Sequence, residues 1–148
     1  MRRKLFLALG LMVVLLSSSA LAGWTQPFPV SVDLEERFAA GDMATARYAK
    51  DSLAFIGCGI RSFDDGEGGN FSFGFCQAGD AAGVTAACFT EDPDMLKVMA
   101  ATSDFSFIFF GWAGEGDDAT CTRVGRSTQS FYLPKGMKAN KGTPVDDD

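Results

Sequence analysis

The sequence predicts a mainly β fold, a small antiparallel β-sandwich or open barrel with one short helix and two disulfides. Six or seven short segments alternate apolar and polar residues as strands do, and clusters of Gly, Pro, Asn and Asp separate them. The chain has four cysteines behind an export leader, which indicates two disulfide bonds. With 47% hydrophobic residues and 14 Phe, it has enough apolar side chains to build a core.

Residues 1–22 have the pattern of a secretory signal peptide. Three basic residues precede an apolar run from Leu5 to Leu16, and Ala20-Leu21-Ala22 supplies a cleavage site of small residues. As a helix the run spans about 18 Å, well short of the roughly 30 Å hydrocarbon core that a membrane anchor must cross. We therefore expect export to a bacterial periplasm or to the extracellular space, with no membrane span after cleavage.

The rest of the chain divides into three parts. Residues 23–42 form an extended lead-in, because two prolines favour extended backbone, and one or two helical turns are expected at Asp33–Ala40. Residues 43–134 form the β domain. Residues 135–148 are polar and have no periodicity, which predicts a disordered tail.

The β domain contains seven candidate strands and one candidate helix. Alternating residues in Phe71–Cys76 indicate one buried face, whereas the second half of Asp104–Trp112 is apolar on both faces, as in a central strand. The helix Met95–Ala101 follows Asp92-Pro93-Asp94, where an aspartate caps and the proline suits the first turn. The expected strands are Met43–Tyr48, Leu53–Arg61, Phe71–Cys76, Val84–Thr90, Asp104–Trp112, Ala119–Val124 and Thr128–Leu133.

The segment Asp80-Ala81-Ala82-Gly83 predicts a hairpin register. A three-residue hairpin loop is a type I turn followed by a residue in the left-handed region, and Gly83 stands where that residue is needed. Asp80 then lies opposite Val84. The same register pairs Cys76 with Cys88 and Phe75 with Phe89.

This register favours one of the possible cysteine pairings. Opposed residues lie within disulfide distance, so we predict a Cys76–Cys88 bond and, by elimination, a Cys58–Cys121 bond. The alternative pairs Cys58 with Cys76 and Cys88 with Cys121. It is disfavoured because Cys58 shares a face with two isoleucines, while Cys76 lies opposite the phenylalanine face. A zinc site is disfavoured because the cysteine spacings of 18, 12 and 33 lack the close pairs typical of structural zinc.

Several short motifs between Ala46 and Pro134 resemble motifs found in other proteins. They are Ala46-Arg47-Tyr48, Lys50-Asp51-Ser52, Ile56-Gly57-Cys58, Cys76-Gln77-Ala78, Asp80-Ala81-Ala82-Gly83, Cys88, Phe107-Ile108 and Cys121. In these motifs the chain resembles a group of small exported bacterial proteins of unknown function with a four-cysteine framework. The resemblance implies the compartment and the cysteine framework, and it implies no catalytic residues.

The acidic loop of residues 64–70 is a candidate calcium site. Asp64, Asp65, Glu67 and Asn70 place oxygen ligands on a glycine-rich loop, and calcium takes six to eight oxygens. The twelve-residue EF-hand loop with its closing Glu is absent from the sequence. The alternative is a solvated hairpin loop in which Gly and Asp serve the turn. No other cofactor is expected.

Catalysis is weakly supported by the residue types. The chain has no histidine, which removes imidazole bases and histidine metal sites. A carboxylate-based hydrolase needs one carboxyl group in an apolar pocket, and only Asp51 and Asp104, beside strands, are half-buried candidates. Five aromatic residues between Phe105 and Trp112 suggest a ligand platform, but strand periodicity with large side chains is more typical of a core.

Charge and export together indicate a binding module. The chain has 19 acidic and 13 basic residues, and three of the basic residues lie in the leader, which leaves 10 and a net charge of −9 for the mature chain. That charge disfavours nucleic acids and anionic membrane surfaces. We therefore expect a non-enzymatic envelope module that binds a protein, glycan or lipid partner. The alternatives are a calcium-dependent binding domain and, less favoured, a small hydrolase.

Overall fold

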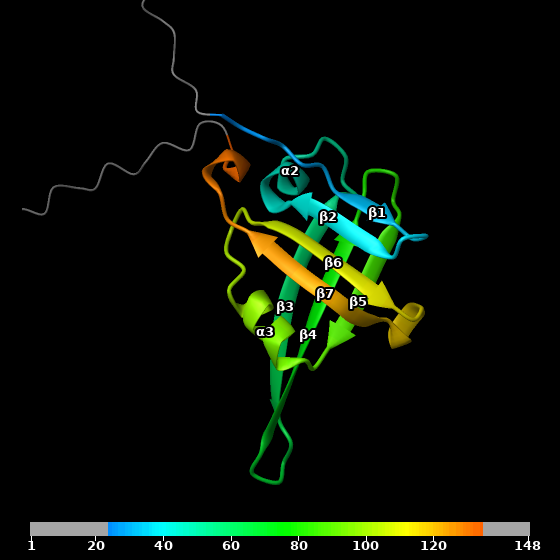
Figure 1. Cartoon of the computed structure of the whole chain (residues 1–148), viewed down its shortest axis with the longest axis vertical. Coiled ribbons are helices and arrows are strands. Elements are labelled where there is room, and N and C mark those ends of the chain that lie inside the picture. The colour runs from blue at the N-terminus through cyan, green and yellow to red at the C-terminus, as the bar shows by residue number, and fades with distance from the viewer. Residues whose placement is uncertain (1–23, 135–148) are drawn as a thin grey trace, which may run out of the picture.

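A computed structural model describes residues 24–134 of the chain, so the predicted signal peptide and polar tail lie outside the described residues. In the described part, seven strands form one mixed sheet in the order β1-β2-β6-β7-β5-β4-β3 (Figure 1). The strands are β1 (Ser31–Asp33), β2 (Phe38–Asp42), β3 (Phe55–Asp64), β4 (Asn70–Gly79), β5 (Thr85–Thr90), β6 (Phe107–Ala113) and β7 (Thr120–Ser127). The helices are α2 (Met43–Arg47), α3 (Pro93–Ala100) and the 3-10 helices η1 (Gly116–Asp118) and η2 (Ser130–Tyr132).

The prediction of a mainly β fold with two disulfides is confirmed, and the sheet is open, not closed. Two antiparallel groups, β1-β2-β6-β7 and β5-β4-β3, meet between β5 and β7. This contact is parallel and has a single register pair, Phe89 with Thr120. The Phe89 amide donates to the carbonyl oxygen of Ala119 at 2.9 Å. The sheet is therefore mixed, where we expected a purely antiparallel one.

The sheet curls so that its two ends approach each other. β1 lies against β4, α2 packs beside β2 and β3, and α3 packs over β3, β4 and β7. The helices thus fill the gaps that a closed barrel would close with strands. The core between these elements contains Ala39, Ile56, Cys76, Ala78, Cys88, Met99, Ile108, Phe110 and Cys121.

Helix α2 replaces an expected strand, and residues 24–134 contain two α-helices where we expected one. Asp42, only 1% exposed, is its N-cap. One carboxylate oxygen accepts from the Thr45 amide at 2.7 Å, and the other accepts from the Thr45 hydroxyl and from the Phe28 amide at 2.6 Å. Met43–Tyr48 alternates like a strand, but this buried cap starts a helix there and ties the helix to the lead-in.

The lead-in also differs from expectation at Asp33–Ala40. The chain is extended as predicted, but it enters the sheet as β1 and β2, and the expected helical turn is replaced by these strands and the turn between them. Asp33 accepts from the amides of Glu35 and Glu36 and so shapes a tight turn between the two strands. At the other end of the domain, the expected strand Thr128–Leu133 is instead η2.

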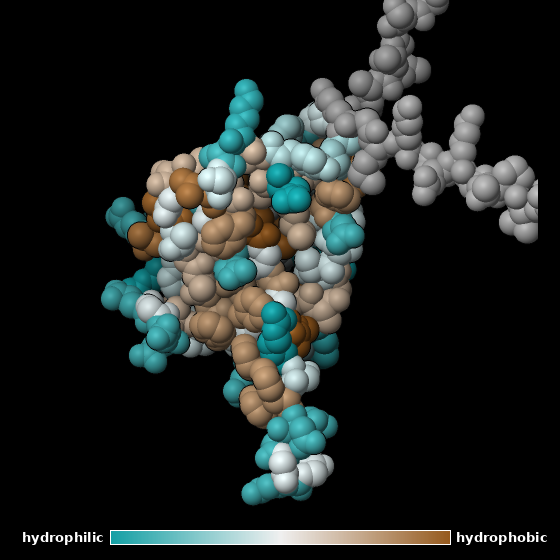
Figure 2. All heavy atoms as spheres, turned by 180° about the vertical axis from the view of Figure 1, so that it is seen from behind, coloured by the Kyte–Doolittle hydropathy of each residue, from teal (hydrophilic) through white to brown (hydrophobic). Residues whose placement is uncertain are grey.

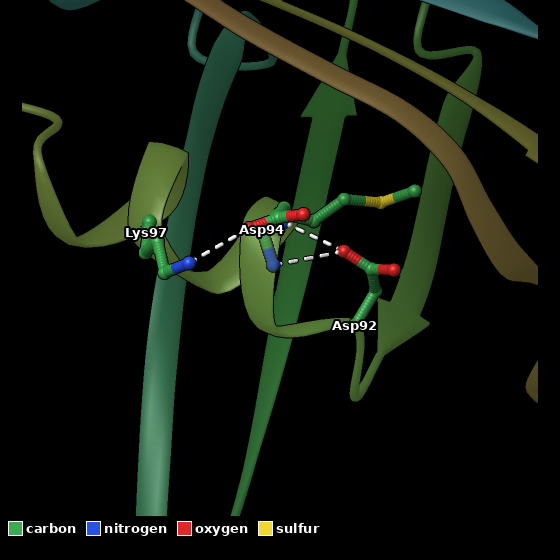
Figure 3. A network of polar contacts seen from close by, with 4 residues as sticks. Asp92, Asp94 and Lys97 are labelled. Atoms are coloured by element: carbon green, nitrogen blue, oxygen red, sulfur yellow. Dashed lines mark hydrogen bonds and ion pairs between the residues drawn. The ribbon is translucent and has the colours of Figure 1, made fainter.

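Helix α3 lies close to its predicted position. Asp92 caps it, because its carboxylate accepts from the amides of Asp94 and Met95, both at 2.9 Å, and Lys97 pairs with Asp94 at 2.7 Å (Figure 3). The helix packs on β4 at Gly74, where a Cβ would collide with Met99 and Leu96. Glycine at this position therefore permits the helix to cover the core.

The predicted hairpin register is confirmed, but the predicted disulfide pairing is wrong. Cys76 lies opposite Cys88 and Phe75 opposite Phe89, as expected. Cys76 also lies opposite Cys58 on its other side, and the bonds are Cys58–Cys76 and Cys88–Cys121. The four cysteines thus form a row across β3, β4, β5 and β7.

The hydrogen-bond pattern of the hairpin explains this choice. The Asp80 amide donates to the Val84 carbonyl oxygen at 3.0 Å, so these two residues form a hydrogen-bonded pair. Hydrogen-bonded and non-hydrogen-bonded pairs alternate along two antiparallel strands, so Cys76 and Cys88 also form a hydrogen-bonded pair. The main-chain N–H and C=O groups of one residue point to the same neighbouring strand. Because those of Cys76 form hydrogen bonds with β5, Cys58 and Cys76 are a non-hydrogen-bonded pair. Such pairs bring their side chains closer, and here the two Cα atoms are 4.1 Å apart. Cys88 is then left for Cys121 on β7.

We predict that removing the two disulfides has unequal cost. The loop-entropy model assigns about 4 kcal/mol to Cys88–Cys121, which spans 33 residues, and about 3 kcal/mol to Cys58–Cys76, which spans 18. Urea unfolding of the two double-serine variants measures both values. A larger loss for the Cys58, Cys76 variant would contradict this order.

Candidate functional site

The outer face of β3, β4 and β5 carries an exposed row of phenylalanines. The core-facing side of β4 is the one that holds Cys76, so the alternating phenylalanines of this strand point away from the core. Phe63 on β3 lies opposite Phe71, and Phe89 on β5 lies opposite Phe75. We call this set the phenylalanine ladder: Phe63, Phe71, Phe73, Phe75 and Phe89.

Four of the five rings pack against one another, and three of them remain largely exposed to solvent. Phe63 stacks on Phe71 and on Phe73, with ring centroids 5.3 and 5.9 Å apart, and Phe73 lies 6.1 Å from Phe89. Phe63, Phe71 and Phe89 are 46%, 51% and 43% exposed. Figure 2 shows apolar residues continuing along the projecting β3–β4 hairpin to a polar tip. A contiguous exposed apolar surface of this kind is typical of an interaction site.

Among the described strands, the ladder borders an edge that no further strand covers. β3 is the last strand of the sheet, and since Cys58 and Cys76 are a non-hydrogen-bonded pair, the main-chain groups of Ile60 and Ser62 point away from β4. The Ser62 and Ser72 hydroxyls are 2.7 Å apart, as expected for the same kind of pair. Arg61 donates to the Ile60 carbonyl at 3.1 Å, and its guanidinium lies 5.0 Å from the Phe75 ring centroid. Apart from the Ile60 carbonyl, which Arg61 occupies, the edge thus offers main-chain donors and acceptors beside aromatic rings.

At the hairpin tip, the predicted calcium ligands Asp64 and Asp65 bind the loop backbone. Asp64 accepts from the Gly66 amide at 2.7 Å, and Asp65 accepts from the amides of Glu67 and Gly69 at 2.8 and 2.9 Å. These two hydrogen bonds lower the pKa of the Asp65 carboxyl, and the one from the Glu67 amide has the larger effect. Asn70 begins β4 opposite Asp64. Within residues 24–134, no group of three or more Cys, Asp or Glu side chains is placed to hold a metal ion.

The two carboxylates singled out for hydrolysis are not half-buried. Asp51 and Asp104 are both exposed. Asp51 accepts from the amides of Ala54 and Leu53, and these bonds lower its pKa, whereas a general acid needs a raised one. The central aromatic segment is divided between two environments, because Phe110 is fully buried and Trp112 lines a surface cleft.

Neither α2 nor α3, the α-helices of the described residues, has the length and apolar content needed to cross a membrane.

No protein-family model matches the chain, and no curated protein or solved structure is significantly similar to it. The functional interpretation therefore depends on the geometry of this chain alone.

We predict that calcium leaves the stability of the domain unchanged, because Asp64 and Asp65 already serve the loop backbone. The melting temperature should be equal in EDTA and in about 5 mM calcium, above the Kd range of extracellular calcium modules. The variant Asp65→Ala should melt lower by the same amount in both solutions. A calcium-dependent rise that Asp65→Ala abolishes would favour the calcium-binding alternative.

Proposed function

We propose that the protein is an exported, non-enzymatic interaction module that binds an extended segment of a partner protein. The observation that carries the proposal is the exposed phenylalanine ladder beside the free edge of β3. An extended peptide adds to such an edge through main-chain hydrogen bonds and places alternate side chains on the adjoining face. Natural edge strands that are long and apolar are usually protected, so an open one beside exposed rings favours a binding role.

Among the three partner classes open from the sequence, the ladder favours a protein. A glycan needs many hydrogen-bonding side chains, but phenylalanine has none, and between Gly57 and Phe63 the outer positions of β3 supply two glycines and a single hydrogen-bonding side chain, Arg61. An anionic lipid surface is repelled by the carboxylates of Asp64, Asp65 and Glu67 at the tip. A polypeptide supplies both apolar side chains that can pack on the rings and main-chain groups that can pair with the edge of β3.

Export is supported by the leader and by the disulfides. Two disulfides persist in an oxidising compartment such as a periplasm or the extracellular space. The absence of histidine from the chain and the lowered pKa of Asp51 support a binding role over acid–base catalysis.

We predict that a photo-crosslinker in the ladder captures a defined protein partner. p-Benzoylphenylalanine replaces Phe63 or Phe71 in the full chain, and the cells that produce it are irradiated. Tyr48, which is 67% exposed, is the control position; it follows α2, which lies at the opposite end of the molecule from the β3–β4 hairpin (Figure 1). The same discrete protein adduct should form from both ladder positions and not from Tyr48. Adducts to lipid or glycan only, or the same adducts from Tyr48, would contradict the proposal.

A pair of variants tests the strand edge itself. Ser62→Pro removes an outward main-chain N–H without breaking a hydrogen bond between β3 and β4, and proline is tolerated on edge strands. The substitution also removes the hydroxyl contact to Ser72, so Ser72→Ala is the matched control that loses this contact alone. The crosslinked adduct should fall with Ser62→Pro and persist with Ser72→Ala. Equal adduct yields from the two variants would show that the partner does not use the edge.

A further inference from the structure

A concave surface lies at the end of β3, β4 and β5 that is opposite the hairpin tip. It is a cleft of about 640 Å³ between the start of β5, the β1–β2 turn and the β6–β7 turn. This size lies in the range of small-ligand sites. Its polar side chains come from four separate parts of the chain, and Trp112 supplies an aromatic wall. The side chains used below are Arg37, Gln77, Thr85, Trp112, Glu115 and Asp117.

The cleft exists because β5 and β7 diverge. They share only the Phe89–Thr120 pair, and the Phe89 amide points toward β7. Main-chain groups two and four residues earlier, at Ala87 and Thr85, point in the same direction because strand residues alternate. Among the described residues, no strand pairs with this side of Ala87 or Thr85. Unpaired main-chain donors and acceptors therefore line the cleft.

Arg37 stands at a position that suits glycine. Its φ of 50° lies in the left-handed region, which is unfavourable for a residue with a Cβ. Its guanidinium lies 3.6 Å from the Glu115 carboxylate across the cleft, but these side chains are 43% and 90% exposed. An ion pair so open to water contributes little to stability. Stability therefore does not explain why an arginine occupies the strained position, whereas a ligand contact does.

We propose that this cleft binds a neutral carbohydrate, a function separate from partner binding at the ladder. Sugar hydroxyls both donate and accept hydrogen bonds. The cleft offers side chains of each matching kind: a donor (Arg37), acceptors (Glu115, Asp117) and groups that do both (Gln77, Thr85). The indole of Trp112 offers an apolar surface to a sugar ring. Two carboxylates against one guanidinium disfavour an anionic ligand.

An extended peptide fits this cleft less well. The open edge of β5 is bounded by the Asp80–Gly83 turn at one end and by the Phe89–Ala119 hydrogen bond at the other. Only Thr85 and Ala87 present outward main-chain groups between these limits. A peptide strand gains little affinity from so short an edge, whereas a sugar ring needs only a few hydrogen bonds.

Proton–nitrogen NMR titration of the full chain tests the proposal. The probes are maltose, cellobiose and chitobiose, with digalacturonic acid as the anionic comparison. At least one neutral disaccharide should shift the Trp112 indole and the Thr85 and Ala87 amides, and the anionic one should bind about tenfold more weakly. Absence of such shifts for all three neutral sugars, shifts located elsewhere, or equal binding of the acid would overturn the proposal.

Variants separate ligand binding from folding. Arg37→Gly relieves the positive φ, so its melting temperature should stay equal or rise while sugar affinity falls about tenfold. Gln77→Ala should also weaken binding, and Arg126→Ala, at the far end of β7, should not. Undiminished sugar affinity in Arg37→Gly, or a lower melting temperature that accounts for the lost binding, would overturn the role assigned to Arg37. Neither result depends on the ladder, so this test and the crosslinking test fail independently.

Discussion

The Cys88–Cys121 disulfide joins two parts of a sheet that hydrogen bonds barely connect. Ten register pairs hold β3 to β4, and the Cys58–Cys76 bond reinforces contacts that already exist. Between β5 and β7 there is one register pair, so the disulfide there takes the place of a row of main-chain hydrogen bonds. The cysteine row, buried except at the half-buried Cys58, thus fixes the order of the sheet, and it fits a protein that folds under oxidising conditions.

Both candidate sites follow from this arrangement. Because β5 and β7 touch at one point, they separate toward the start of β5 and leave room for the cleft around Trp112. Because the disulfides are buried on the inner face, the phenylalanines that alternate with Cys76 must face outward. The free edge of β3 is the end of the same open sheet. Stabilising the sheet by covalent links instead of closure leaves an edge and a gap available for binding.

Local signals in the sequence predict local structure well and long-range contacts poorly. The Asp80–Gly83 turn gives the correct register, and the Asp92 cap gives α3. The face argument against Cys58–Cys76 is wrong, because Cys76 and the isoleucines beside Cys58 all lie on the inner face. The turn also fixes which pairs are hydrogen-bonded, and this distinguishes the two pairings. Local pattern does not predict helix α2, because its cap depends on a buried contact between Asp42 and Phe28. The cleft brings together residues from distant turns, and no short pattern places them side by side.

Amide hydrogen exchange at Phe89 tests the role of the Cys88–Cys121 bond most directly, since this amide donates across the β5–β7 contact. Replacing both Cys88 and Cys121 with serine should remove most of its protection, while the Asp80 amide in the β4–β5 hairpin stays protected. Replacing Cys58 and Cys76 instead should leave Phe89 protected. Equal protection of Phe89 in both double variants would contradict the view that this disulfide holds the two parts of the sheet together.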